Sequence, residues 1–143
     1  EISEKSFSLE KDIQDITEKN MEQVFGLEFV KSEYSLNNFR IDSLCFDKRT
    51  NSFVIIEYKN TKNFSVIDQG YSYLSLMLNN KAEFVLLYNE VMEKNIRKDS
   101  VDWTQSRVIF VSPTYTIYQK EFLSIFLNLW QAYSETTLPL NFF

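Results

Sequence analysis

Histidine is absent from the 143 residues, and cysteine occurs once, at Cys45. The absence of histidine excludes Ser-His-Asp triads, Cys-His nucleophiles and zinc sites with histidine ligands. A single cysteine excludes both a disulfide framework and a zinc site built from cysteines. We therefore expect Cys45 to be a buried thiol in a reducing, cytoplasmic compartment. Chemistry based on carboxylates and a metal ion remains open.

Glycine and proline occur only twice each, and no apolar run approaches the roughly 20 residues of a membrane-spanning helix. The chain also opens with no signal-peptide pattern. We therefore expect a chain rich in regular secondary structure that makes no membrane contact. Its 143 residues, 44% of them hydrophobic, fit a single folded domain over residues 1–143.

Positive charge is scarce, because 15 Lys and Arg residues stand against 20 Asp and Glu residues and leave a net charge of −5. Proteins that grip nucleic acid by themselves normally carry an excess of Lys and Arg. A nucleic-acid function would therefore rely on other parts of a larger protein. The start at Glu1 in place of Met and the apolar end from Leu140 to Phe143 also indicate a fragment of something longer.

The segment from Phe39 to Lys59 indicates two strands joined by a turn. Aromatic and β-branched residues fill 39–47 and 53–59, and the polar residues 48–51 separate them. If Asp47 faces Ser52 across the turn, the same register places Asp42 opposite Glu57 on one face of the hairpin. Lys59 falls on that face as well, whereas Tyr58 points to the other face and leaves its backbone carbonyl within reach.

Two like charges directly opposed on a sheet destabilise it, so we expect a positive group between Asp42 and Glu57. Two carboxylates and a carbonyl oxygen suit a hard cation such as Mg²⁺. A lysine beside such a cation can steady water or the charge that grows on a phosphodiester. The same residues are equally compatible with an acid at a strand end and an ordinary Glu/Lys pair. A one-residue slip would place the two acids on opposite faces.

Asp42, followed by Glu57, Tyr58 and Lys59 at the end of an apolar strand, resembles the D…(D/E)-x-K core of the PD-(D/E)XK nuclease superfamily. Further motifs support the resemblance: Gln69 and Tyr73 match the Q-x-x-x-Y motif of its RecB-like branch. Two segments, VIIEYKN and the later FSVIDQGYSYLSLMLNNKAEFVLLYNE, are similar to those of uncharacterised bacterial proteins of this superfamily. More distantly, they resemble the nuclease domain of archaeal mismatch endonucleases. The resemblance covers most of the chain, from Phe7 to Trp130. It departs from the pattern at Ile41, where a proline is expected.

This resemblance implies a Mg²⁺-dependent deoxyribonuclease in which Mn²⁺ can substitute. Asp42, Glu57 and the Tyr58 carbonyl would hold the metal, and Lys59 would position or activate water. Gln69 and Tyr73 would orient the lysine or a phosphate by hydrogen bonds. Without the resemblance, Tyr73 is better interpreted as a core residue and Gln69 as a residue at the rim of the core. Many members present an acid from the first helix, and the match here is Glu10. The alternative for Glu10 is a favourable interaction with the helix dipole.

The remaining pattern predicts helices and strands in the order of an α/β fold, with a central mixed β-sheet flanked by helices on both sides. The resemblance adds that this would be a restriction-endonuclease-like core. The expected helices are Leu9–Phe25, capped by Ser8 and ended by Gly26, Phe64–Asn80 and Tyr115–Trp130; the further strands are Leu27–Tyr34, Glu83–Tyr88 and Arg107–Ser112. The polar stretch Asn89–Thr104 is either a surface excursion or an arm that contacts nucleic acid through its basic residues and Trp103.

Two functions follow from these observations. The first is hydrolysis of phosphodiester bonds in DNA, with RNA not excluded, in restriction, repair or defence. The alternative is a module on the same fold that binds nucleic acid or a partner protein without catalysis, which the acidic balance favours. A homodimer, or additional domains in a longer chain, is compatible with both.

Overall fold

The computed structural model describes residues 2–59, 66–112 and 141–142, and their side chains within 10–59 and 68–112. The described strands form one sheet in the order β1-β2-β3-β4-β5. Its strands are β1 (Glu28–Leu36), β2 (Phe39–Asp47), β3 (Ser52–Tyr58), β4 (Arg107–Val111) and β5 (Asn141–Phe142). The first three pair antiparallel, whereas β4 runs parallel to β3 and β5 parallel to β4. The helices of the described ranges are α1 (Ile2–Lys19), α2 (Met21–Phe25), α3 (Val66–Asn79) and α4 (Lys81–Met92), with the short 3₁₀ turns η1 (Lys98–Ser100) and η2 (Trp103–Gln105).

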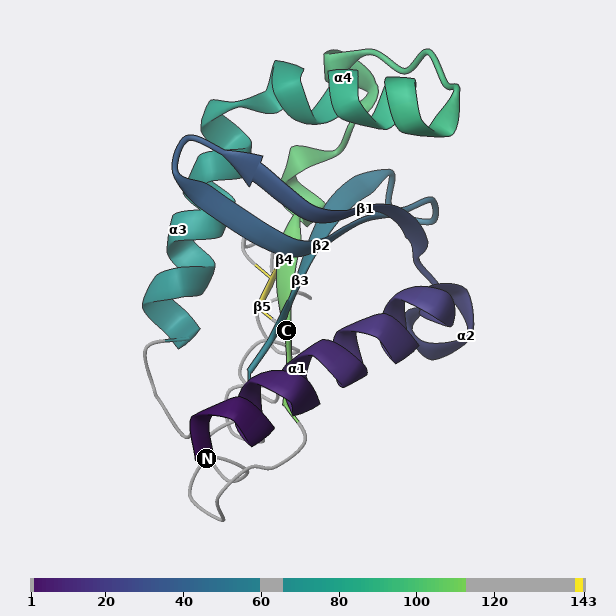
Figure 1. The fold of residues 1–143 in the computed structure, drawn as a ribbon. Helices are drawn as coiled ribbons and strands as arrows, with labels where there is room; N and C mark the ends of the chain where they lie inside the picture. Colours follow the sequence, from purple (N-terminus) through teal and green to yellow (C-terminus); the bar gives the residue numbers. More distant parts are fainter. Residues whose placement is uncertain (1, 60–65, 113–140, 143) are drawn as a thin grey trace.

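Helices cover the sheet from both sides (Figure 1). On one side, α3 and α4 pack on the larger core, which includes Leu44, Phe53, Ile55, Met77 and Phe84. On the other side, Met21 of α2 packs with Leu27 and with the strand residues Cys45, Val54, Ile56 and Tyr58. Alternate residues of β2 and β3 therefore enter opposite cores, as the period of two in a strand requires. The predicted α/β class with a central mixed sheet and flanking helices is confirmed.

The predicted register of the β2–β3 hairpin is also confirmed. Cα partners run from Asp47 with Ser52 to Ser43 with Ile56. Asn51 closes the turn in the left-handed region at φ +55°, which asparagine tolerates better than most residues. The turn and the alternation of apolar residues thus fix which side chains share a face.

The turn end of the hairpin is held by a buried ion pair. Asp47 is 1% exposed and accepts a 2.7 Å hydrogen bond from Arg107 Nη2 of β4, and Arg49 lies 3.3 Å away. Burial alone would raise the pKa of Asp47, but the bonds from Arg107 and Arg49 outweigh it and lower the pKa to about 2. The pair ties the antiparallel half of the sheet to its parallel half.

The first helix differs from the prediction in both its ends and its buried face. Ser8 does not cap it, because α1 begins at Ile2 and Ser8 lies inside it. The helix breaks at Asn20, whose side chain donates to the Ile16 carbonyl at 2.8 Å, and α2 follows. Gly26 ends α2 at φ +67°, as predicted. Glu10 is consequently in mid-helix, so the predicted first-turn dipole interaction is wrong.

The sequence also predicts that Leu9, Ile13, Ile16 and Val24 form one apolar stripe of this helix. The side chain of Leu9 lies outside the described residues, Ile13 packs on the smaller core as predicted, and the prediction is wrong for Ile16 and Val24. Ile16 is 63% exposed and Val24 is 56% exposed, whereas the polar Gln14 and Thr17 are buried at 5% and 7%. Cys45 is buried as predicted, and burial raises the pKa of its thiol to about 12.

The predicted strand Glu83–Tyr88 does not exist, because these residues lie within α4. Phe84, Val85 and Tyr88 face the core, while Leu86 is 58% exposed. The spacing of the buried residues is helical, so the run of apolar residues was misassigned to a strand. The other strand predicted after the second helix, Arg107–Ser112, corresponds to β4 and is confirmed.

The segment after α4 packs against the hairpin turn. Asp102 donates its N–H to the Asn51 carbonyl at 2.8 Å, and Trp103 stacks on Phe53 with centroids 5.6 Å apart. Trp103 is thus a half-buried packing residue. The helix predicted for 115–130 and the polar loop 60–63 lie outside the described residues. None of the described helices has the length and apolar character needed to cross a membrane.

Candidate active site

Asp42 and Glu57 converge at the end of the β2–β3 hairpin opposite its turn. Regular pairing of the two strands stops at Ser43 and Ile56, and the two acids replace the next rung with crossed side-chain bonds. Glu57 Oε1 accepts from the Asp42 N–H at 2.9 Å, and Asp42 Oδ2 accepts from the Tyr58 N–H at 3.0 Å. The two carboxyl groups are therefore held close together by the backbone of the opposite strand.

Glu57 is 2% exposed, on the α3 side of the sheet. Burial and the neighbouring charge of Asp42 raise the pKa of Glu57 to about 8, against the opposing pull of Lys59. A positive group was expected between the two acids. Lys59 has this role only in part, because its charge does not outweigh burial and the charge of Asp42. The remaining repulsion between the two carboxylates marks the place where a cation would stabilise them.

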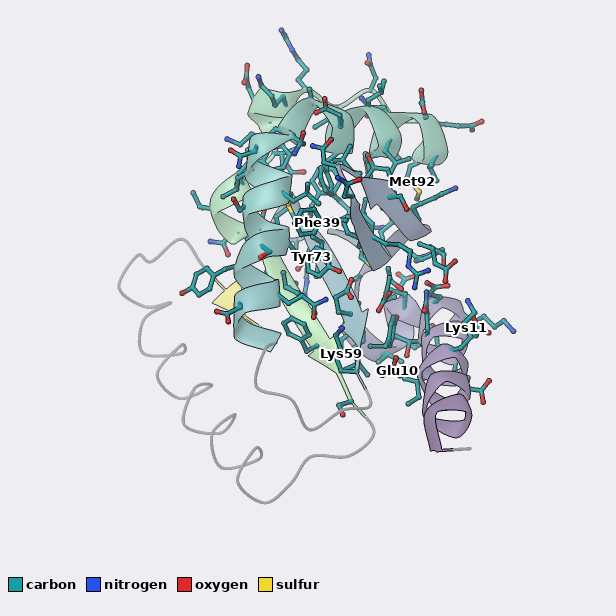
Figure 2. The ribbon with its side chains drawn as sticks, turned by 60° about the vertical axis from the view of Figure 1, so that its left-hand side comes forward. Glu10, Lys11, Phe39, Lys59, Tyr73 and Met92 are labelled. Carbon is teal, nitrogen blue, oxygen red and sulfur yellow. The ribbon has the colours of Figure 1, made fainter. Side chains whose placement is uncertain are left out.

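Lys59 follows β3 directly and is half-buried. Its N–H donates to the Val111 carbonyl at 2.8 Å, which fixes the backbone at this position against β4. Its ammonium lies near enough to Glu57 to lower that pKa. Figure 2 shows Lys59 at the same end of the molecule as Glu10 of α1. Tyr58 turns to the opposite face, where burial raises the pKa of its phenol.

Gln69 and Tyr73 come to this site from α3. Gln69 Nε2 donates to Tyr73 Oη at 3.4 Å, and Tyr73 Oη donates to the Arg40 carbonyl at 2.9 Å. Burial and the charge of Glu57 raise the pKa of Tyr73. Tyr73 therefore stays a neutral donor beside Glu57 and holds the start of β2 in place.

The donor set of the site suits a hard cation. Asp42 and Glu57 offer carboxylate oxygens, and Mg²⁺ is usually held by one or two carboxylates, with water and substrate phosphate completing its shell. Among the described residues, no three Asp, Glu, Cys or His side chains are grouped so as to hold a metal ion. Glu10, which is half-buried, accordingly does not form a three-acid group with the pair.

Three polar residues behind the acids were not anticipated from sequence. Gln14 Nε2 donates to the Asp42 carbonyl at 3.0 Å and to Glu18 Oε1 at 3.0 Å. Glu18 Oε1 also accepts from Ser43 Oγ at 2.7 Å. The sequence alone predicts Glu18 on the solvated face of the helix, and this is wrong, because Glu18 is half-buried against the sheet. The spacing of Glu10, Gln14 and Glu18 by four residues places them on one face of α1 and was the signal available.

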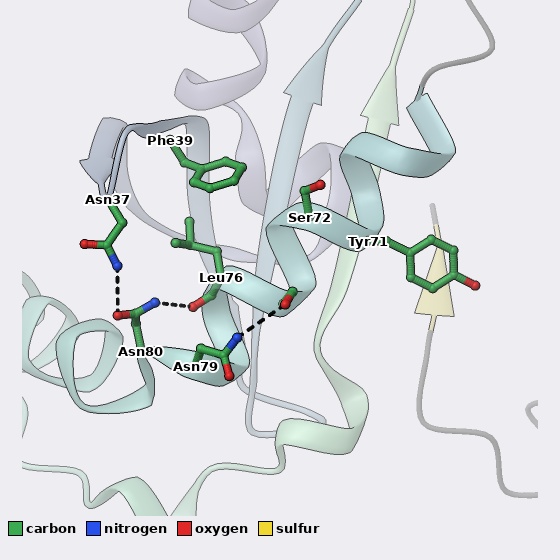
Figure 3. A pocket seen from close by; sticks show the side chains of 8 residues that line it. Asn37, Phe39, Tyr71, Ser72, Leu76, Asn79 and Asn80 are labelled. Carbon is green, nitrogen blue, oxygen red and sulfur yellow. Dashed lines mark hydrogen bonds between the residues drawn. The ribbon is translucent and has the colours of Figure 1, made fainter.

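A groove lies beside this site (Figure 3). It has a volume of about 560 Å³ and runs between α3 and the β1–β2 turn. Its lining is entirely uncharged: Asn37, Phe39, Tyr71, Ser72, Ser75, Leu76, Asn79 and Asn80. Phe39 links the groove to the site through an edge contact with Tyr73, at 5.9 Å between centroids. Asp42 and Glu57 are not among the residues that line it.

Comparison with known proteins gives similarity in sequence and in fold. No protein-family model matches the chain. An uncharacterised protein of Haemophilus influenzae is 46% identical over 135 residues, which make up 92% of this chain and 45% of that protein. The chain thus spans less than half the length of this relative.

Two solved structures resemble the fold at a TM-score of 0.47 and 20% identity, and each match covers 80% of this chain. One is the EndoMS-dsDNA2 complex, of which the match covers 40%, and the other is a repair endonuclease from Pyrococcus abyssi, of which it covers 42%. The function is therefore best derived from the side chains of the site.

Proposed function

We propose that this chain is a Mg²⁺-dependent nuclease domain of the PD-(D/E)XK type that hydrolyses phosphodiester bonds in DNA. The observation that carries the proposal is the pair Asp42 and Glu57, held together by crossed backbone bonds with Lys59 alongside. A buried carboxylate beside a second, half-buried one is costly unless a cation neutralises the pair, and this favours a metal site over a structural one.

Each residue has a role in this proposal. Asp42 and Glu57 would hold the cation together with the Tyr58 carbonyl. A bound Mg²⁺ would supply Lewis acidity toward a phosphate oxygen and lower the pKa of a water molecule. Lys59 would orient the attacking water and stabilise charge that develops on the phosphate. Gln69 and Tyr73 would keep Glu57 and the start of β2 in position.

Substrate binding would depend on more than this chain. The net charge of −5 gives little attraction for a phosphate backbone. DNA binding would come from further domains or a second subunit, with this domain supplying the cut. The Mn²⁺-bound protein would be active for the same reason as the Mg²⁺ form, because both ions accept oxygen ligands.

The test is cleavage of plasmid DNA, single-stranded DNA and RNA in the presence of Mg²⁺ or Mn²⁺. Wild-type protein should cut DNA, and Glu57→Gln or Lys59→Met should reduce the rate by about 100-fold or more. The first change removes a ligand of the cation, and the second removes the charge that would act on the reacting phosphate. Glu22→Gln and Lys19→Met, at exposed positions away from the site, serve as matched controls and should cut like wild type.

Equal cleavage by wild type and Lys59→Met would show that the activity comes from a contaminant and would sink the mechanism. Absence of cleavage in a folded protein with added metal would favour the non-catalytic binding module, which the acidic charge also suits.

A further inference from the structure

Asp42 lies at a gap in the sheet. On the β1 side, Ser32 pairs with Ser43 and Tyr34 with Ile41, but the intervening Glu33 and Asp42 do not appear as partners. Glu33 has φ +52°, a left-handed conformation that is strained for a residue other than glycine in a strand. The backbone of Asp42 must therefore find its hydrogen bonds outside the ladder.

Gln14 of α1 fills this gap. Its Nε2 donates to the Asp42 carbonyl at 3.0 Å and approaches Ser32 Oγ of β1 at 3.3 Å. The Asp42 N–H meanwhile donates to Glu57. On the β1 side of Asp42, a side chain from α1 thus donates the hydrogen bond that a neighbouring strand would otherwise supply. Gln14 is 5% exposed, so water does not offer an easy substitute for its amide.

A second chain of hydrogen bonds leads from α1 to Tyr58. Ser43 Oγ donates to Glu18 Oε1 at 2.7 Å, because a carboxylate only accepts. The contact of 3.0 Å between Ser43 Oγ and Tyr58 Oη then has Tyr58 as the donor. Ser43 is next to Asp42, and Tyr58 stands between Glu57 and Lys59. The hydrogen bonds from Glu18 through Ser43 to Tyr58 therefore contact both β2 and β3 on the α1 side of the sheet, opposite the face that carries Glu57.

We propose that Gln14 and Glu18 are positioning residues, which set the backbone at Asp42 and Tyr58 and thereby the separation and direction of the site carboxylates. This inference rests on the proposed function for its catalytic consequence, but its geometric part stands by itself. α1 is then a support for the site in addition to a cover for the sheet. Partners behind metal-binding groups typically affect affinity or activity by about 10- to 100-fold.

The geometric part is tested by hydrogen exchange of backbone amides in the metal-free chain. In Gln14→Leu, the amides of Asp42 and Tyr58 should exchange at least about tenfold faster relative to the other amides of β2 and β3. The matched control is Thr17→Ala, which removes a buried side chain from the same helix and none of these hydrogen bonds. In the control, these two amides should change by the same factor as their neighbours. Identical exchange patterns in the two variants would overturn the proposal.

The catalytic consequence is tested by the Mn²⁺ dissociation constant and by cleavage kinetics. Gln14→Leu and Glu18→Leu should weaken Mn²⁺ binding and lower kcat by about tenfold or more at nearly constant KM, whereas Thr17→Ala should alter neither. Glu18→Gln keeps an oxygen that can accept from Ser43, so it should stay within about threefold of wild type.

Two outcomes separate this inference from the proposed function. If wild type binds Mn²⁺ and cleaves DNA while Gln14→Leu does so equally well, the positioning role is wrong and the nuclease stands. If folded wild type does neither, the nuclease and the catalytic consequence fall together, and the exchange of the Asp42 and Tyr58 amides alone decides whether α1 sets the backbone.

Discussion

Glu57 is the residue on which the proposed chemistry of this chain depends. It is a carboxyl group at 2% exposure, beside Asp42 and on the same face as the larger core. Burial and the charge of Asp42 raise its pKa to about 8. A folded chain without metal therefore binds a proton at Glu57 more tightly than the unfolded chain does.

The pH dependence of stability follows from that difference. A glutamate carboxyl ordinarily has a pKa of 4.5, and that of Glu57 in the folded chain is about 8, so between these values the folded state retains a proton that the unfolded state has lost. The contribution of Glu57 is therefore most favourable below pH 4.5 and is lost as the pH rises toward 8. With EDTA present, the free energy of unfolding of wild type, minus that of Glu57→Gln, should fall across this window. Urea titrations at a series of pH values measure it, and a difference that is flat or rises with pH would contradict the prediction.

At the level of residues, the sequence predicts the contact between Asp42 and Glu57 because a tight turn and a period of two leave little freedom of register. It did not predict how the acids are held. The crossed bonds to the Asp42 and Tyr58 amides arise only where regular pairing stops after Ser43. The role of Glu18 was missed because an acid on a helix surface ordinarily faces water.

The helices show where local pattern fails to determine an element. Residues 84–88, which follow Glu83, are all apolar or aromatic, and such a run fits either a strand covered on both faces or a helix. The structure decides for α4 because Phe84, Val85 and Tyr88 meet the side chains of β1, β2 and β3, including Phe46 and Phe53. In α1 the helix was predicted but its buried face was not, because the side chains that meet Ser43 and the Asp42 carbonyl are polar.

Two substitutions distinguish the helix from the predicted strand. Phe84 is fully buried, so Phe84→Ala should destabilise the chain by about 3 to 5 kcal/mol. Leu86 is 58% exposed, so Leu86→Ala should cost less than about 1 kcal/mol. A strand buried on both faces would make both changes costly. Urea denaturation compares the two variants, and similar large losses in both would contradict the helical assignment.

For the whole molecule, the sequence predicted a central mixed sheet with helices on both sides, because this class depends on local periodicity and on the order of elements, but it wrongly placed Glu83–Tyr88 in the sheet. It could not predict the pairing of β5 with β4, since a strand of two residues, Asn141–Phe142, leaves no periodic signal. The charge of −5 and the open groove beside the site are also properties of the whole chain. In the proposed function, a cation would bind the acids first and offset their charge before DNA binds.

The most direct test of the central claim is a calorimetric titration of the metal-free chain with Mn²⁺ at pH 8, close to the pKa of Glu57, where the cation displaces the proton more easily than at neutral pH. Wild type and the control Glu22→Gln should bind Mn²⁺ with the same affinity, and both Asp42→Asn and Glu57→Gln should lose that binding while remaining folded. Binding that survives in either site variant, or a folded wild type that takes up no Mn²⁺, would contradict the account.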